Sequence, residues 1–186
     1  MISTRIRPLA VGCLALLASA CSTLAPAPPQ TDNHQWRIEG KLGITTPDES
    51  LSGFLIWEQN QSTYSIHVSG PLGQGSTQIE GDEHQVTLTQ GAHQVQSDDP
   101  NHLIYEQMGW RFPINNLKYW VVGEASPLSS AHSEFDGERL ALLEQDGWEV
   151  AYFRYDAYTG LPSRLRISQG EWRFLLVIKR WSLATL

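Results

Sequence analysis

Cysteine is scarce in this sequence, with only Cys13 and Cys21 among 186 residues. Cys13 lies in an N-terminal segment typical of a secretory signal peptide. In it, two arginines precede an apolar run, residues 9–17, that is too short to span a bilayer. Removal of residues 1–20 leaves Cys21 as the only thiol of the mature chain. No internal disulfide can then form, so the single domain that this length supports has to rest on its hydrophobic core.

Positive charge is the second scarce feature. The 13 Lys and Arg residues are outnumbered by 20 Asp and Glu residues, which gives a formal charge of −7. Removing Arg5 and Arg7 with the signal segment, which contains no acid, lowers this charge to −9. This excess of negative charge argues against a nucleic-acid partner and against binding of anionic lipid by a cluster of basic residues.

Familiar catalytic and metal-binding motifs are missing as well. The six histidines do not have the spacing of a zinc-protease helix or a zinc finger. No Gly-x-Ser-x-Gly nucleophile elbow occurs. The glycine-rich residues 70–75 lack the Gly-Lys-Ser/Thr ending of a phosphate-binding loop. We therefore predict a protein that is not an enzyme and that holds no metal. A hydrolase is retained only as a distant alternative.

The residues that surround Cys21 indicate a lipid anchor. Ala18-Ser19-Ala20-Cys21 resembles the lipobox of bacterial lipoproteins, with Ala18 where the pattern usually has Leu. The alternative is an ordinary cleaved signal followed by an incidental cysteine, but a lone thiol in a secreted chain needs an explanation. We expect N-acyl and S-diacylglycerol modification of Cys21 and no other cofactor.

A polar, proline-containing segment follows the predicted anchor. Residues 21–34 include Pro26, Pro28 and Pro29 among small and polar residues. In polyproline geometry, at about 3.1 Å per residue, such a segment reaches roughly 40 Å. We interpret it as a tether between the membrane and a single folded domain, residues 35–186.

From residue 35 onward, a two-residue hydrophobic period predicts about eleven short antiparallel strands. The alternating apolar positions are Trp36, Ile38, Leu42 and Ile44; Leu55 and Trp57; Tyr64, Ile66 and Val68; Ile79; Val86 and Leu88; Val95; Leu140 and Leu142; Trp148, Val150 and Tyr152; Leu165 and Ile167; and Trp172, Phe174, Leu176 and Ile178.

The middle of the chain changes period and predicts two or three short helices. One begins at Asp98-Asp99-Pro100 with a capping carboxylate and ends at Gly109; a second begins near Pro113 and ends at Gly123. A sheet of so many twisted strands curls or closes. Periodicity leaves two architectures open. One is an open half-barrel with the helices as a lid over an apolar cavity, and the other is a fully packed sandwich.

A large apolar residue stands alone in the loop SGPLGQGS, residues 69–76. Leu72 is flanked by Pro71 and Gly73, and all its neighbours in the loop are small, polar or turn-forming. A single exposed leucine is ordinary in itself, so composition alone does not assign it a role.

Several of these motifs together resemble the LolB family of outer-membrane lipoproteins, and the resemblance covers the whole chain. Its carriers are the lipobox ending at Cys21, Trp36-Arg37 with Gly40-Lys41, Phe54-Leu55-Ile56-Trp57, Gly70-Pro71-Leu72-Gly73, Gly109-Trp110-Arg111-Phe112-Pro113-Ile114 and Leu117-Lys118-Tyr119-Trp120-Val121-Val122-Gly123. The family often has Asn where this chain has Gly70.

The resemblance implies a fold and a function. It favours the open antiparallel half-barrel with a helical lid around an acyl-chain cavity. It implies an acceptor, anchored in the outer membrane and facing the periplasm, that receives lipoproteins from the carrier LolA and inserts them into the membrane. Ser22 fits this location, since in the family's sorting logic Asp after the lipidated cysteine favours retention in the inner membrane.

The resemblance also directs attention to particular residues. It implies that Leu72 contacts the membrane. Strand parity combined with the family fold predicts acyl-chain contacts at Trp57, Ile66, Ile79, Trp120, Trp148 and Tyr152. The expected partners are LolA, lipoprotein acyl chains and outer-membrane lipid, with no nucleic acid and a monomeric chain. The alternatives are a generic lipid or lipoprotein carrier and a structural outer-membrane lipoprotein.

Overall fold

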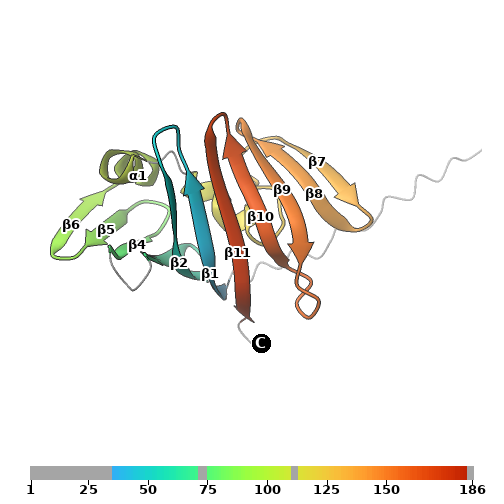
Figure 1. The fold of residues 1–186 in the computed structure, drawn as a ribbon, viewed down its shortest axis with the longest axis horizontal. Coiled ribbons are helices and arrows are strands. Elements are labelled where there is room, and N and C mark those ends of the chain that lie inside the picture. The colour runs from blue at the N-terminus through green and yellow to red at the C-terminus, as the bar shows by residue number, and fades with distance from the viewer. Residues whose placement is uncertain (1–34, 71–74, 110–112, 184–186) are drawn as a thin grey trace, which may run out of the picture. The chain divides into compact units, whose positions relative to one another are not determined.

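Eleven antiparallel strands and two helices make up the part of the chain that the structure, a computed structural model, describes: residues 35–70, 75–109 and 113–183. These residues belong to one compact unit (Figure 1). The elements are β1 (Gln35–Thr45), β2 (Ser50–Asn60), β3 (Thr63–Ser69), β4 (Thr77–Gly81), β5 (Val86–Gln90), β6 (His93–Ser97), α1 (Pro100–Met108), α2 (Ile114–Trp120), β7 (Ala131–Asp136), β8 (Arg139–Gln145), β9 (Trp148–Tyr155), β10 (Pro162–Gln169) and β11 (Trp172–Leu183).

All the strands form one continuous sheet, in the order β6-β5-β4-β3-β2-β1-β11-β10-β9-β8-β7. Two meanders, β1 to β6 and β7 to β11, are joined side by side because the first strand pairs with the last. The two end strands, β6 and β7, do not pair with each other, so the sheet is open (Figure 1). The predicted open antiparallel sheet is therefore confirmed, and the packed sandwich is excluded.

The predicted two-residue period places the core on one face of this sheet. In β1, Trp36, Ile38, Leu42 and Ile44 are buried, and the residues between them are partly or fully exposed. Paired strand β11 buries Phe174, Leu176 and Ile178 on the same face. We call this the concave face, because both helices pack on it, and the opposite side the convex face.

A bulge at Gly40 shapes the seam between the two meanders. Glu39 pairs with Arg180 but Gly40 pairs with Ile178, so Lys179 is an extra residue in β11. A Cβ atom on Gly40 would lie less than 3.0 Å from the carbonyl oxygen of Val177. Only glycine permits this close backbone approach.

Gly40→Ala should therefore weaken the seam, whereas Gly43→Ala on the same strand should not. A Cβ atom on Gly43 would meet the Leu175 side chain at an ordinary 3.7 Å. We expect Gly40→Ala to lower the free energy of unfolding by about 2–3 kcal/mol and Gly43→Ala to change it by less than about 0.5 kcal/mol. Denaturant unfolding followed by circular dichroism measures both; equal effects would contradict a tight seam.

Both helices begin and end close to the predicted residues. Asp99 caps α1, since its carboxylate accepts a hydrogen bond from the backbone N–H of His102 at 3.0 Å. Gly109 ends α1 in the left-handed conformation, with φ of 68°. The two helices are linked where α2 begins, because the N–H of Ile114 donates to the Asn101 side chain at 3.3 Å. Among the hydrogen bonds of the described residues, this one links the two helices at the start of α2.

Candidate functional site

An enclosed apolar cavity lies between the helices and the concave face. It is small, about 30 Å³, which is close to the volume of one water molecule. Its lining side chains come from six strands, β1 to β4, β10 and β11, and from the two helices with the C-cap of α2: Leu42, Leu55, Trp57, Ile66, Val68, Ile79, Ile104, Leu117, Val121, Ile167, Phe174 and Leu176. No polar side chain lines it among the described residues, so the cavity suits hydrocarbon and offers a water molecule no partner.

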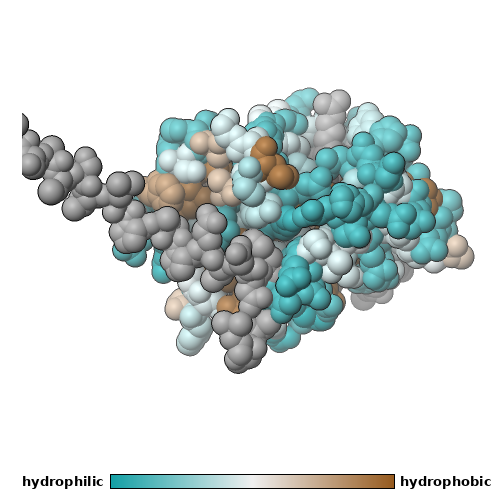
Figure 2. Space-filling view, turned by 180° about the vertical axis from the view of Figure 1, so that it is seen from behind, coloured by the Kyte–Doolittle hydropathy of each residue, from teal (hydrophilic) through white to brown (hydrophobic). Residues whose placement is uncertain are grey.

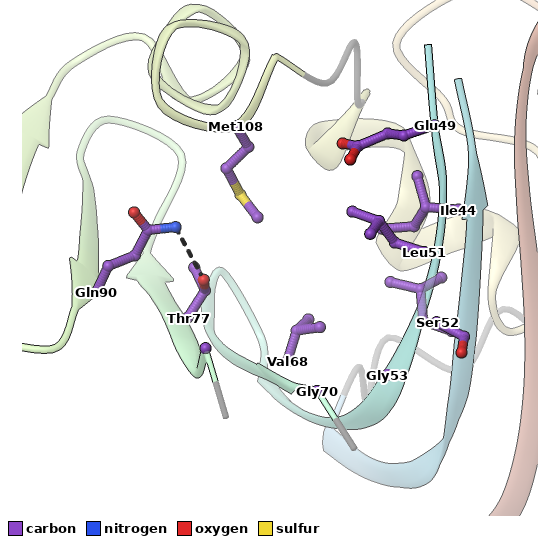
Figure 3. A pocket seen from close by; sticks show the side chains of 12 residues that line it. Ile44, Glu49, Leu51, Ser52, Gly53, Val68, Gly70, Thr77, Gln90 and Met108 are labelled. Carbon is purple, nitrogen blue, oxygen red and sulfur yellow. Dashed lines mark hydrogen bonds between the residues drawn. The ribbon is translucent and has the colours of Figure 1, made fainter. Parts of the chain in front are cut away.

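A larger, open pocket of about 350 Å³ adjoins this cavity and shares Leu42 and Val68 with it. In Figure 3, Met108 from the end of α1 points into the pocket from one side, and Leu51 and Ile44 from the β1–β2 hairpin point in from another. The Gln90 amide donates to the Thr77 hydroxyl at 3.0 Å on the remaining side. The volume lies within the range of small-molecule sites, and the pocket forms an apolar entrance to the covered core.

Three of the predicted cavity residues come together in the enclosed cavity. Trp57 on β2, Ile66 on β3 and Ile79 on β4 all line it, and Ile66 pairs with both others in the sheet register. The indole N–H of Trp57 donates to the side chain of Gln59 at 3.1 Å. The polar edge of the ring is therefore satisfied, and its apolar surface faces the cavity.

The other three, Trp120, Trp148 and Tyr152, are buried on the concave face but do not line either of these two pockets. Trp148 packs against Phe174, with ring centroids 6.1 Å apart. The Tyr152 hydroxyl donates to the backbone carbonyl of Trp120 at 2.8 Å. Their contact with acyl chains stays a prediction, and in this structure their contacts connect α2 to the sheet.

Gln145 is the centre of that connection, and sequence reasoning did not identify it. Its side chain, only 2% exposed, accepts hydrogen bonds from the indole N–H of Trp120 at 2.8 Å and the backbone N–H of Ser126 at 2.9 Å. Its amide nitrogen donates to the carbonyl oxygens of Ser126 and Ser129 at 2.7 and 3.0 Å. Asn116 adds a hydrogen bond of 2.7 Å to Asp146. Helix α2 is therefore held to the β8–β9 hairpin by polar contacts.

The electrostatics of this region follow from burial. Burial raises the pKa of the Tyr152 hydroxyl well above its ordinary value, and nearby Tyr155 and Glu124 raise it further. Burial also raises the pKa of Tyr155 to about 12, against the opposing effect of Arg139. Both hydroxyls thus stay neutral at physiological pH, as donors with well-defined partners.

Helix α1 is attached differently. The side chains that it buries are all apolar: Pro100, Leu103 and Ile104. It lies beside β5 and β6 at the outer end of the first meander (Figure 1). Ile104 lines the enclosed cavity and Met108 the open pocket. Apolar contacts can slide or separate without leaving buried hydrogen-bonding groups unpaired, so α1 is better suited than α2 to move.

The surface on the side of the helices is mostly polar where it can be seen. Figure 2 shows this face as mainly hydrophilic outside its grey atoms, with small, separate hydrophobic patches. The apolar side chains of the concave face are thus largely covered. The described residues contain no helix long and apolar enough to cross a membrane and no group of three or more metal-ligating side chains. Cys21, Ser22 and Leu72 lie outside the described residues.

Comparison with a solved structure defines the class of this fold. A LolA superfamily protein from Nitrosomonas europaea superposes with a TM-score of 0.51 at 8% sequence identity, covering 82% of this chain and 87% of that chain. The similarity concerns the fold alone. The chain is thus a LolA-type half-barrel: an open antiparallel sheet with helices over its apolar face.

Sequence comparison then identifies the family. The family model for outer membrane lipoprotein LolB matches residues 34–181. The outer-membrane lipoprotein LolB of Stutzerimonas stutzeri is 38% identical over 95% of this chain and 95% of its own length. That of Pseudomonas aeruginosa is 43% identical over 78% of this chain and 73% of its own length. The chain therefore belongs to the LolB family, as the resemblance of its motifs predicted.

Proposed function

We propose that this chain is an outer-membrane lipoprotein acceptor that takes the acyl chains of lipoproteins into its half-barrel and inserts them into the membrane. The observation that carries this proposal is the apolar, helix-covered concave face in a member of the LolB family. Burying one methylene is worth about 0.8 kcal/mol, so one chain of about 15 methylenes is worth about 12 kcal/mol. A triacylated cargo cannot cross water unaided and needs such a surface at each stage.

The closed cavity is too small for an acyl chain, so acceptance requires the lid to move. We propose that α1 moves away from β5 and β6 while α2 stays on the β8–β9 hairpin, since only α2 is held there by the Gln145 hydrogen bonds. The open pocket at Met108 then becomes continuous with the enclosed cavity, because the two already share Leu42 and Val68.

The remaining parts of the proposal concern location and supply. Lipidated Cys21, followed by Ser22, anchors the chain in the outer membrane on the periplasmic side, and residues 21–34 tether the domain. A soluble carrier of the LolA type delivers the cargo. Transfer requires only slightly better acyl burial in the acceptor than in the carrier, followed by a larger gain in the bilayer, and it requires no nucleotide.

Transfer of a fluorescently labelled lipoprotein from a purified LolA-type carrier tests this function. We expect the label to move to this protein and then into added phospholipid vesicles. Label that stays on the carrier would refute the acceptor role. Transfer by the protein in both directions without vesicle insertion would favour a generic carrier. Absence of saturable binding of an apolar probe would favour a structural lipoprotein.

Two adjacent residues of β3 provide a matched pair for this assay. Ile66 lines the cavity, whereas His67 points to the convex face. Thr is β-branched like Ile and is well suited to a strand at either position. We expect Ile66→Thr to weaken acceptance about fivefold to tenfold through lost apolar contact, and His67→Thr to leave it unchanged. Circular dichroism verifies that both variants are folded. Equal acceptance would place the acyl chain elsewhere.

A further inference from the structure

The convex face of the central strands has a charge opposite to that of the whole chain. Strands β10 and β11 contain five basic residues and no Asp or Glu: Arg164, Arg166, Arg173, Lys179 and Arg180. The chain as a whole has a formal charge of −7. The negative net charge argued against binding to anionic lipid. It does not reveal this local excess of positive charge.

Strand register brings three of the basic side chains onto one surface. Lys41 on β1 is paired with Val177 on β11, and Val177 is paired with Arg164 on β10. Arg173 lies on the same side of β11, four residue pairs further along, and all three basic side chains are exposed. Neighbouring strands lie about 4.8 Å apart, so the three charges span only a few strands. We call Lys41, Arg164 and Arg173 with their surroundings the basic face.

Two other cations nearby are neutralised, but these three are available. Arg166 is paired with Glu149 at 3.1 Å, and Arg180 with Glu39 at 2.9 Å. Within the described residues, Lys41, Arg164 and Arg173 have no carboxylate within ion-pair distance. Their positive charge is therefore free to attract an external anion.

Apolar and aromatic groups accompany the charges. The Lys41 ammonium lies 5.5 Å from the centre of the Phe54 ring, and Phe54 is 51% exposed. On the other side of the face, the Arg166 guanidinium lies 5.5 Å from the Phe153 ring, which is 54% exposed. Leu175 and Val177 lie half-buried between them. Aromatic rings with an apolar body beside a cation are typical of surfaces at the membrane–water interface.

The rim of the open pocket has the opposite charge. The open pocket is lined from the concave face by Leu42 and Ile44, and Glu49 lies at its rim. Asp48 and Glu106 line the adjoining depression. An anionic bilayer would repel this rim and attract the basic face, so electrostatics alone orients the domain.

We propose that the basic face binds the phosphate groups of anionic phospholipids and holds the domain on the bilayer with its acidic pocket rim turned away from the membrane. In this orientation the pocket is accessible to incoming cargo. The headgroup contact needs no cargo, so it stands or fails independently of the acceptor role.

Vesicle binding by the mature chain carrying Cys21→Ala tests the contact without the acyl anchor. Every buried core residue lies between Trp36 and Ile178, so this change leaves the described fold complete. We expect binding to vesicles of phosphatidylglycerol mixed with phosphatidylcholine, weak binding to phosphatidylcholine alone, and loss of binding at high salt. Equal binding to both vesicles would overturn the proposal.

Two double variants with the same change in net charge separate a local site from a general charge effect. Each basic residue close to an anionic surface contributes about fivefold in affinity, so Arg164→Gln with Arg173→Gln should reduce vesicle binding about thirtyfold. Lys118→Gln with Arg139→Gln, outside the basic face, should leave it unchanged. Equal losses of vesicle binding in the two double variants would show that binding depends on net charge and not on the basic face. If the first variant binds vesicles normally but binds an acidic carrier less well, the face is a protein-docking surface instead.

Fluorophores on single cysteines report the orientation, because the Cys21→Ala mature chain contains no other thiol. Ser168 lies on the basic face, paired with Arg173, and Glu106 lies on α1, in the depression beside the open pocket. With a quencher on the lipid headgroups, we expect quenching of the label at Ser168→Cys and little at Glu106→Cys. The reverse pattern would overturn the proposed orientation.

Discussion

Leu72→Glu should abolish insertion of lipoproteins into the membrane while leaving their acceptance from the carrier intact. Transfer of a charged side chain into the bilayer centre costs about 2.5–3.5 kcal/mol, whereas a leucine gains about 0.5 kcal/mol. If the tip of the 69–76 loop enters the bilayer, a difference of about 3 kcal/mol slows insertion by roughly a hundredfold. Leu72 lies outside the described residues, so its role is proposed from the sequence and the family.

The measurement separates the two half-reactions of the transfer assay. Label should accumulate on the Leu72→Glu protein and fail to enter vesicles, and Leu72→Phe should restore entry because it is apolar again. Leu128, 66% exposed in the segment between α2 and β7, provides the matched control. Leu128→Glu should insert cargo normally. Normal insertion by Leu72→Glu would remove this residue from the mechanism.

Local sequence signals were sufficient where the structure depends on neighbouring residues. The alternation in β1 correctly predicted the buried positions of Trp36 and Ile38, because a regular strand places every second side chain on one face. Asp98-Asp99-Pro100 and Gly109 correctly marked the two ends of α1, since capping depends on the few residues at each helix end; the structure makes Asp99 the cap. The open form of the sheet, by contrast, was selected by the family resemblance and not by periodicity.

β-bulges interrupt the two-residue hydrophobic period in two places. Leu140 and Leu142 were expected to share the buried face of β8, but the structure buries Leu140 and Leu143 and leaves Leu142 partly exposed. The register shifts opposite Glu134 and Phe135, which inserts one residue and exchanges the faces. The same exchange in β11 brings Trp181 opposite Ile38. A bulge is set by its partner strand, so a single strand's sequence does not reveal it.

Long-range contacts explain what was missed or differently placed in the candidate site. Parity correctly put Trp148 and Tyr152 on the buried face, but whether that part of the face lines a cavity or packs under α2 depends on where the helix lies. Edge strand β7 carries no alternating pattern, because its residues are nearly all exposed. In the sequence, Gln145 is an ordinary polar residue before a turn. Its role becomes visible only from its hydrogen bond to the indole of Trp120, 25 residues away in the chain.

Gln145→Ala should produce the largest loss of stability of any polar substitution in the domain. It leaves the Trp120 indole N–H and the Ser126 backbone N–H without their acceptor, and both groups are buried. Each unpaired buried group costs about 1–3 kcal/mol, so we expect a loss of about 3–5 kcal/mol in the free energy of unfolding. At this chain length that corresponds to a melting temperature lowered by roughly 10 °C.

Gln169→Ala is the matched control, because the Gln169 amide makes one exposed hydrogen bond of 3.3 Å to the carbonyl of Gly147. It should cost less than about 1 kcal/mol. A double-mutant cycle with Trp120→Phe tests the specific link: the combined loss should fall short of the sum of the single losses by at least about 1 kcal/mol.

The same substitution tests the division of the lid into a fixed and a moving helix. If Gln145 holds α2 on the β8–β9 hairpin, its removal should increase amide hydrogen exchange in α2 and in residues 121–130 more than in α1. It should also impair acyl acceptance, because the fixed wall against which α1 opens is lost. If exchange rises equally in both helices, the lid moves as one unit, and the proposal that α1 alone opens is wrong.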